Sequence, residues 1–496
     1  MRIRTVPTAS GASAVQVVRY QDGKTRVIKH IGSGRDKDEA AALKQLAQEW
    51  IDQESGQNRL PGWPKENSDQ LLLGKYRYLG FRYGLMAETV LAILNRFGLR
   101  SDSFPSAGMF LNLVLARILQ PGSKRQTQKI LADAFGIRYS LTDIYTCLPG
   151  LVAFQELVEK KLTDFAKSHL GFDFSFVFYD ITTLYFETFK EDRLRKIGFS
   201  KDNKPGQPQI LIGLVVESHG FPLSFYLFTG NKFEGKTLIP VILGFKQKHE
   251  VDNLTIVADA AMISQKNIRA LQKANLNYIV GARLGNAGLT VVADASARLN
   301  RVDGASLKIP TPGGFLICHF SQSRYDKDRH ERQKQLDKAK QILAGKRPAS
   351  RNRFLTKNSK TMYSLNTTLA NKTELLLGIK GYHTNLDIPE QLVIDRYRDL
   401  WQIEKSFRLS KNDLEARPVY HFKKQTIAAH IFICMTALAV LKWLEIATGN
   451  PAKRLVDKLK SVTDARMLNT VTGKEVLMRA SVPPELSILL KKIRPH

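Results

Sequence analysis

Three acidic residues in separate parts of the sequence have the residue types and surroundings of a metal-dependent catalytic site. Asp180 and Asp259 each end an apolar, β-prone run, and Glu404 lies in a segment with helical spacing. Two strand-end acids and a helix acid can hold two divalent metals about 4 Å apart for phosphodiester chemistry. Because carboxylate oxygens and water are the ligands that Mg²⁺ prefers, the pattern predicts a Mg²⁺ site, with Mn²⁺ as a substitute.

Residues around Glu404 could also contact phosphate groups. Tyr397, Glu404 and Lys411 are spaced seven residues apart, which places them on one side of a helix-like run. Tyr397 and Lys411 then lie roughly 10 Å to either side of Glu404, where a phenol and an ammonium could grip successive phosphates. The simpler interpretation is an exposed ion pair between Glu404 and Arg408. A lone strand-end aspartate such as Asp180 is likewise often only a cap or turn residue.

The composition favours a polyanionic partner. The chain has 496 residues, enough for about two to four domains, and its formal net charge is +29, with 75 Lys and Arg against 46 Asp and Glu. A strong positive balance does not specify a fold, but it attracts nucleic acids. The alternative is a basic protein without a nucleic-acid role, because the charge is spread over many segments.

Other sequence features argue against several protein classes. The three cysteines are far apart and form no Cys-x-x-Cys motif, which disfavours a zinc site or a disulfide framework and favours a reducing compartment. The N-terminus lacks the apolar core of a signal peptide. The longest apolar run, 427–440, is shorter than the ~20 residues of a membrane span. We therefore expect a cytoplasmic protein with a buried core helix there and no membrane partner.

The N-terminal third reads as two regions. Residues 1–57 are predicted to form a β-hairpin around Gln21-Asp22-Gly23 and a helix over 38–50, followed by a linker over 58–70. Residues 70–170 are predicted to be mainly helical, with helices over 87–97, 110–119, 125–135 and 154–168. Lys124, Arg125 and Lys129 cluster in the third helical stretch, so this region is interpreted as a helix-turn-helix-like domain that binds DNA ends. A plain helical bundle with a solvated basic face fits nearly as well.

The following region changes to an α/β pattern. Residues 171–284 carry predicted strands over 174–180, 211–217, 222–228, 254–259 and 278–282, with helices over 236–248 and 265–274. Residues 374–449 add a strand over 374–379 and a helix over 388–410. Three antiparallel strands followed by strands entered through helices indicate a ribonuclease H-like mixed sheet. The fourth strand should be parallel to the first, which makes Asp180 and Asp259 neighbours at one edge.

An insertion and a tail complete the predicted organisation. Residues 285–373 interrupt the strand order, and Ser321 to Lys360 within them hold 13 Lys and Arg against 4 Asp and Glu. The charges are mixed in sign, so a solvated helix explains any single residue. A net charge of +9 beside an active-site fold nevertheless favours a phosphate-contacting surface. Residues 450–496 are expected to form a helical tail.

Taken together, these motifs resemble the DDE transposases of bacterial insertion sequences, in the group with a Tyr-x2-Arg-x3-Glu-x6-Lys signature. The likeness covers roughly residues 172–445. The signature arginine is replaced by Leu400, which removes one expected phosphate contact and leaves the three acids intact. The matching blocks are Phe178-Tyr179-Asp180-Ile181-Thr182-Thr183, Gly198-Phe199-Ser200-Lys201-Asp202, Gly230-Asn231 with Thr237, Ala258-Asp259-Ala260-Ala261, Tyr278-Ile279-Val280-Gly281-Ala282-Arg283, and Tyr397, Glu404 and Lys411 in register.

The resemblance implies a ribonuclease H-like catalytic domain with Asp180, Asp259 and Glu404 as catalytic metal ligands. It also implies a homodimer or higher multimer that binds terminal inverted repeats, cuts there, and joins the 3′ hydroxyls to target DNA. The residues expected to contact DNA are Tyr397, Lys411, Lys201, Arg408, Lys124, Arg125 and Lys129. Two alternatives stay open: a domesticated DNA-binding protein that does not cut, and another nuclease on the same fold.

Overall fold

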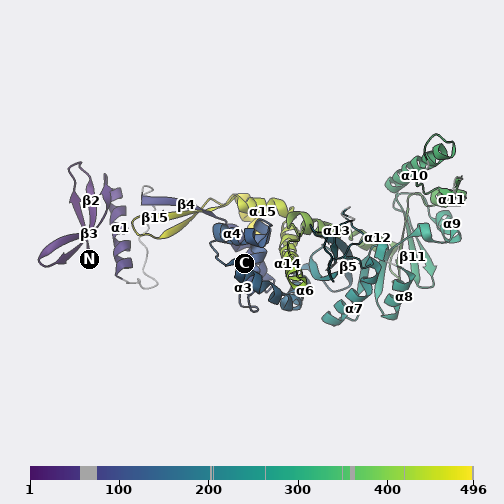
Figure 1. The fold of residues 1–496 in the computed structure, drawn as a ribbon, viewed down its shortest axis with the longest axis horizontal. Helices are drawn as coiled ribbons and strands as arrows, with labels where there is room; N and C mark the ends of the chain where they lie inside the picture. Colours follow the sequence, from purple (N-terminus) through teal and green to yellow (C-terminus); the bar gives the residue numbers. More distant parts are fainter. Residues whose placement is uncertain are drawn as a thin grey trace. The chain divides into compact units, whose positions relative to one another are not determined.

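The structure is a computed structural model, and it describes residues 1–55, 75–201, 204, 206–262, 264–348, 350–357, 363–417 and 419–493 (Figure 1). The linker predicted over 58–70 lies outside the described residues. The chain divides into two compact units. The first comprises Met1–Thr89, Ile130–Arg138 and Val456–Lys491, and the second comprises Val90–Lys129, Tyr139–Leu455 and Lys492–His496.

The N-terminal part of the first unit is a three-stranded antiparallel sheet covered by one helix. The elements are β1 (Arg2–Pro7), β2 (Ser13–Gln21), β3 (Lys24–Gly34) and α1 (Lys37–Glu54). The turn between β2 and β3 places Asp22 and Gly23 at φ of 53° and 73°, a left-handed conformation that suits an Asp-Gly pair. Val15, Val17 and Leu43 form its apolar core. The predicted hairpin and helix are confirmed.

A second sheet of the first unit contradicts the expected helical tail. The described residues of this region, 450–493, contain two strands as well as two helices, and the strands form a sheet with a segment near residue 80 in the order β16-β15-β4. The ion pairs of Arg479 with Asp464 at 2.7 Å and Glu88 at 2.6 Å fix this arrangement. The elements are β4 (Tyr76–Arg82), α15 (Ala452–Lys460), β15 (Asp464–Asn469), β16 (Glu475–Arg479) and α16 (Pro484–Ile493).

The N-terminal region of the second unit is helical. The helices are α2 (Gly84–Arg96), α3 (Ala107–Leu119), α4 (Lys124–Phe135), α5 (Leu141–Leu151) and α6 (Gln155–Leu170), of which α2 and α4 contain residues of both units. Helix α5 is absent from our prediction, although Ser140 and Asp143 form a capping box at its start, a recognisable signal of a helix N-terminus.

The long apolar helix α14 (Lys424–Thr448) is the core helix expected from the sequence. It packs against α3, and the rings of Phe110 and Phe432 stack with centroids 4.6 Å apart. By length and composition alone, α14 is the one helix among the described residues that could cross a membrane. Its most apolar window is 94% buried within the protein, so its apolar surface is explained by packing inside the second unit.

The large sheet of the second unit has eight strands in the order β10-β11-β14-β9-β8-β5-β6-β7. β5, β6 and β7 are antiparallel, whereas β8 is parallel to β5 and β9 is parallel to β8, as the crossover rule predicts. The bounds are β5 (Phe176–Tyr185), β6 (Gln209–Val216), β7 (Pro222–Thr229), α7 (Leu238–His249), β8 (Thr255–Ala258), α8 (Gln265–Lys273) and β9 (Asn277–Ala282).

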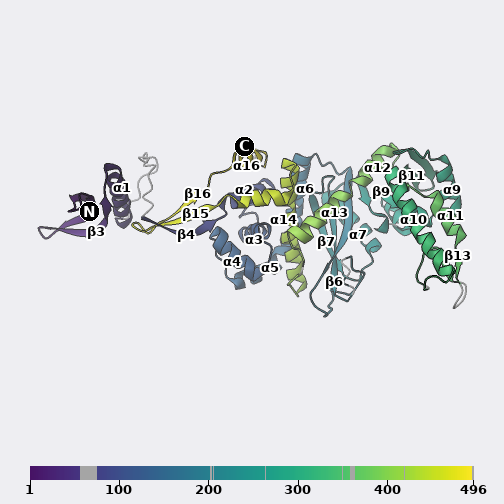
Figure 2. The ribbon, with the colours of Figure 1, turned by 90° about the horizontal axis from the view of Figure 1, so that it is seen from above.

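The insertion contributes to this sheet, which the sequence analysis did not predict. β11 pairs with β14, and β10 pairs with β11 at the edge. The strand predicted over 374–379 is also wrong, because the helix α11 runs to Leu375 and the strand begins at Ile379. The elements are α9 (Leu289–Arg298), β10 (Ser306–Thr311), β11 (Gly314–Phe320), α10 (Gln322–Leu343), β12 (Leu355–Lys357), β13 (Tyr363–Leu365), α11 (Thr367–Leu375) and β14 (Ile379–Thr384) (Figure 2).

The helix predicted over 388–410 is three segments rather than one. They are α12 (Glu390–Arg398), α13 (Trp401–Arg408) and a π-helical turn (Leu409–Asp413). The break follows from the backbone, because the amide of Leu400 donates to the carbonyl of Tyr397 three residues earlier, a tighter turn than the α-helix. Tyr397, Glu404 and Lys411 therefore lie on three different segments, not on one straight face.

Candidate active site

Asp180 and Asp259 are brought side by side by the pairing of β5 with β8. Their parallel register ends at Tyr179 opposite Ala258, and the next residues are Asp180, which is still within β5, and Asp259, which directly follows the end of β8. Neighbouring strands lie about 4.8 Å apart, so the two carboxylates are adjacent. β5 does not end at Asp180 as predicted. It continues to Tyr185 through β-branched residues that stay paired with β6.

The carboxyl group of Asp180 is hard to ionise in the metal-free protein. Burial, with a further contribution from the Glu234 and Asp259 carboxylates, raises its pKa from 3.8 to about 6, while the Lys201 ammonium opposes this effect. A cation next to such a carboxyl group favours its ionised form and lowers its pKa.

The raised pKa of Asp180 predicts a pH-dependent stability. Because the folded-state pKa lies above the unfolded value, this group stabilises the fold below about pH 4, and that contribution is lost as the pH rises through about 6. The effect amounts to at most about 3 kcal/mol. Urea unfolding in EDTA across pH 4–7 should show this loss of stability with rising pH in the wild type and not in Asp180→Asn. Parallel curves for the two proteins would contradict the raised pKa.

Lys201 is anchored against β5 beside Asp180. Its Nζ donates to the carbonyl of Ile181 at 2.6 Å and lies 3.0 Å from a carboxylate oxygen of Glu234. Its backbone amide donates to the hydroxyl of Thr183. Glu234 was missed by the sequence analysis, although it lies between Gly230-Asn231 and Thr237, which belong to a matching block. The ammonium of Lys201 therefore lies close enough to lower the pKa of Asp180 against the effect of burial.

Glu234 and Asp259 lie at two short 3-10 turns that hydrogen bonds connect to each other. Glu234 begins the turn Glu234–Lys236, and Asp259 precedes the turn Ala260–Met262. The buried side-chain amide of Asn267, on α8, donates to the carbonyls of Gly235 and Met262 at 2.6 Å each. Asn267, which the sequence analysis also missed, thus ties together the segments that carry the two acids.

Tyr397 is buried and faces Asp259. Its hydroxyl donates to Oδ1 of Asp259 at 2.8 Å, and burial together with the Asp259 charge raises its pKa far above the usual range. A Cβ on Gly281 would lie 2.5 Å from this hydroxyl, so the close approach requires glycine. The phosphate contact predicted for Tyr397 does not match this placement, because its hydroxyl is engaged by a carboxylate of the same chain.

Glu404 is exposed on α13, which packs against β5. The buried hydroxyl of Ser406 donates to the carbonyl of Gly220 at 2.7 Å, which fixes α13 on the turn between β6 and β7. Glu404 makes no ion pair with Arg408 among the residues that the structure describes. The Glu404 and Asp259 charges both act to raise the pKa of Lys380, against the larger lowering effect of burial. The Glu404 and Asp259 charges therefore both act on Lys380.

The acidic residues of this site meet part of the requirements for binding a divalent cation. The hard carboxylate oxygens of Asp180 and Asp259 are suitable ligands for Mg²⁺. The pKa of Asp180 is raised mainly because its carboxyl group is buried, with smaller contributions from the Glu234 and Asp259 charges. Within the described ranges, however, no three His, Cys, Asp or Glu side chains are grouped closely enough to hold a metal. Glu404 is thus not gathered with the two aspartates as a third ligand.

The predicted DNA-contacting residues are placed in different environments. Lys124 is only 4% exposed, and burial and Arg117 lower its pKa to about 7, so it does not lie on the basic helix face expected from the sequence. Arg125 and Lys129 on the same helix are exposed. Arg408 is exposed on α13, and Lys411 is partly buried in the π-helical turn.

Comparison with known proteins identifies one family over this region. The family described as "Transposase DDE domain" matches residues 172–440. Among solved structures, the cryo-EM structure of a piggyBac transposase synaptic complex with hairpin DNA is similar over 84% of this chain and 76% of its own chain, with 10% sequence identity and a TM-score of 0.37. No curated protein matches the sequence.

Proposed function

The chain belongs to the family of transposases with a DDE domain, and from this premise we propose that it is the DNA transposase of a bacterial insertion sequence. In this proposal it cuts DNA at the terminal inverted repeats of the element and joins the freed 3′ hydroxyls to target DNA. The observation that carries the proposal is the pair Asp180 and Asp259 on adjacent parallel strands inside the matched span. The order β7-β6-β5-β8-β9 supports a ribonuclease H-like catalytic domain.

The proposed catalytic set is Asp180, Asp259 and Glu404, with Mg²⁺ as the cofactor and Mn²⁺ as its substitute. When bound, two such ions supply an activated oxygen nucleophile and stabilise the leaving oxygen. Asp180 and Asp259 contribute carboxylate oxygens from fixed strand positions. Glu404 contributes from α13, which must bring it closer to the pair. Tyr397 orients Asp259 through the hydrogen bond from its hydroxyl.

The proposed DNA contacts follow from charge and position. Exposed Lys201 lies beside Asp180, exposed Arg408 lies on α13 with Glu404, and partly buried Lys411 lies on the π-helical turn that follows. Arg125 and Lys129 offer a separate exposed basic face on α4. We assign these residues to phosphate contacts, which position a duplex without reading its sequence. Assembly of two or more copies on paired element ends, in the cytoplasm, belongs to the same proposal.

The test uses the protein with DNA duplexes that carry the sequences flanking its gene. We expect Mg²⁺-dependent strand cleavage at inverted repeats in that DNA and joining of the cut 3′ ends to a second duplex. Denaturing gels with end-labelled strands measure both steps. Binding to the repeats without cleavage in Mg²⁺ or Mn²⁺ would favour a non-cutting DNA-binding protein. Cleavage without preference for the repeats would favour a different nuclease.

A further inference from the structure

The second unit contains a cavity of about 350 Å³ with a mixed polar and apolar lining, beside the large sheet and the helices of the insertion. It is formed by the residues that follow β9, the start of β14, and the helices α10 and α11. Five cationic side chains and two carboxylates line it, which leaves a formal charge of +3. The cations are Arg283, Arg324, Arg332, Arg353 and Lys380, and the acids are Asp328 and Glu331. We call this cavity the insertion pocket.

Two of these cations are held by the protein itself. Arg324 pairs with Asp328 at 3.3 Å, and Arg332 pairs with Glu374 at 2.9 Å while also donating to the carbonyl of Ala370. The first contact lies within α10, whereas the contacts of Arg332 fix α10 on α11, and both ion pairs partly neutralise the charge of α10. They shape the wall of the insertion pocket rather than provide its binding groups.

The two remaining arginines have exposed guanidinium groups. Arg283 follows the carboxyl end of β9, and Arg353 lies over the ring of Phe354 with its Cζ 5.0 Å from the centroid. Neither makes an ion pair with a carboxylate in the part of the chain that the structure describes. Guanidinium groups in this state suit the bidentate recognition of a phosphate.

Lys380 connects the insertion pocket to the acid pair. It lines the pocket from the first residues of β14, and its Nζ lies 4.4 Å from the ring centroid of Tyr397. The hydroxyl of Tyr397 in turn donates to Asp259. One lysine and one tyrosine therefore connect the insertion pocket to Asp259.

We propose that the insertion pocket binds a backbone phosphate of the DNA strand next to the cleaved bond, with Arg283, Arg353 and Lys380 as its contacts. This inference rests on the proposed function. The positive lining excludes a metal ion as the occupant. A volume near the lower end of the ~300–1,000 Å³ of ligand pockets suits one nucleotide rather than a protein segment. The contacts from Lys380 to Tyr397 and from Tyr397 to Asp259 connect this phosphate site to the acid pair.

The test measures DNA binding without cleavage. Fluorescence anisotropy of a labelled 20-nucleotide single strand in EDTA is recorded from 50 to 300 mM salt for the wild type and for Arg283→Ala with Arg353→Ala. Because each neutralised phosphate contributes about 0.7 to the slope of log K against log salt for single strands, loss of the one pocket phosphate should lower the slope by about 0.7 and the affinity by about fivefold at 0.1 M salt. The matched control is Arg329→Ala with Lys334→Ala, two exposed cations of α10 outside the pocket.

The outcomes distinguish DNA binding in the insertion pocket from nonspecific attraction by basic side chains and from binding of free phosphate. A slope that is unchanged, or that falls equally in the control pair, overturns the proposal. Competition by inorganic phosphate at low millimolar concentration in the wild type alone would assign the pocket to a free anion instead. Arg283→Lys with Arg353→Lys should restore most of the slope and shows that lost binding is not misfolding. If the wild type never cuts DNA, the proposed function fails, whereas the binding difference still decides the pocket.

Discussion

Asp259→Asn is expected to reduce strand cleavage by on the order of 10³-fold, the scale seen when an electrostatic group of an active site is removed, and to leave DNA binding in place. Asparagine has nearly the same shape, and its side-chain oxygen still accepts the hydrogen bond that Tyr397 donates at 2.8 Å. The substitution therefore removes the negative charge and keeps the local structure. Cleavage rates in Mg²⁺, together with anisotropy binding in EDTA, measure the two quantities separately.

The matched control is Asp252→Asn. Asp252 is exposed in the loop before β8, the same strand that carries Asp259 at its other end. It should cut DNA at the wild-type rate, which shows that the loss follows the position and not the removal of any aspartate. Wild-type cleavage by Asp259→Asn would remove the acid pair from the mechanism. Wild-type cleavage by Glu404→Gln would remove only Glu404 and leave the two aspartates.

The acid pair could be predicted from the sequence because its geometry depends on local patterns. Apolar β-prone runs before Asp180 and Asp259 identify two strands, and a helix between them forces a parallel crossover. The register that makes the two residues neighbours then follows from the pairing of β5 with β8. What local patterns could not give is where β5 ends, because its last residues stay extended through pairing with β6.

The features that were predicted wrongly from the sequence share a physical cause, which is pairing or packing between segments that are distant in the sequence. β4 and β15 pair although nearly 390 residues separate them in the sequence, and β10 and β11 join the large sheet only through β14. Lys124 looks like a surface cation in its helix but is buried. Glu234, Asn267 and Lys380 approach the acids only after folding, so no spacing in the sequence indicates their part in the site.

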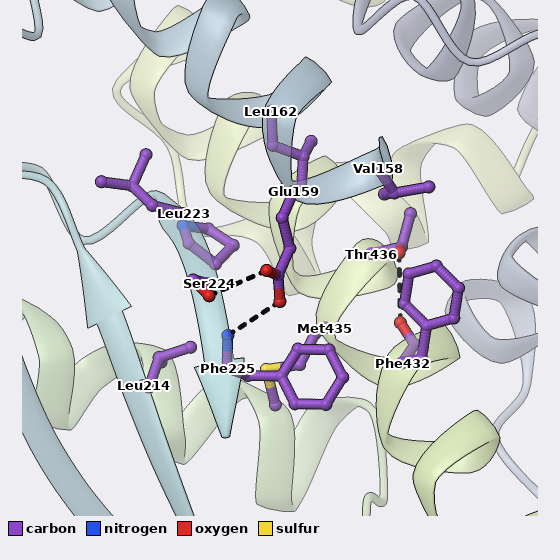
Figure 3. A pocket seen from close by; sticks show the side chains of 11 residues that line it. Val158, Glu159, Leu162, Leu214, Leu223, Ser224, Phe225, Phe432, Met435 and Thr436 are labelled. Atoms are coloured by element: carbon purple, nitrogen blue, oxygen red, sulfur yellow. Dashed lines mark hydrogen bonds between the residues drawn. The ribbon is translucent and has the colours of Figure 1, made fainter. Parts of the chain in front are cut away.

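A buried carboxylate far from the acid pair supports the edge of the large sheet. β7 is an edge strand, which leaves one side of its backbone without a partner strand. Glu159 on α6 accepts hydrogen bonds from the backbone amide of Phe225 at 3.1 Å and the hydroxyl of Ser224 at 2.9 Å (Figure 3). Gln155 donates to the carbonyl of Phe225. These two side chains therefore take the place of a neighbouring strand. Without them, the unpaired backbone of β7 could pair with another chain.

Glu159→Ala is expected to destabilise the second unit by about 3–5 kcal/mol, the scale for breaking a buried ion pair. Lys248, whose Nζ lies 2.5 Å from Glu159, loses its partner, and the buried amide of Phe225 loses its acceptor, which alone costs about 1–3 kcal/mol. The cavity beside Glu159 is only about 10 Å³, so it offers little room for waters to replace the carboxylate. Urea unfolding followed by circular dichroism measures the loss.

Two further variants decide between a specific and a general effect. Glu156→Ala removes an exposed carboxylate from the same helix and should change stability by less than about 0.5 kcal/mol. Glu159→Gln keeps an acceptor for Phe225 but lacks the charge facing Lys248, so its loss should lie between those of the two alanine variants. If Glu159→Ala unfolds at the same urea concentration as Glu156→Ala, the strand-edge role is wrong. The amide of Phe225 would then lose its carboxylate acceptor without lowering the free energy of unfolding.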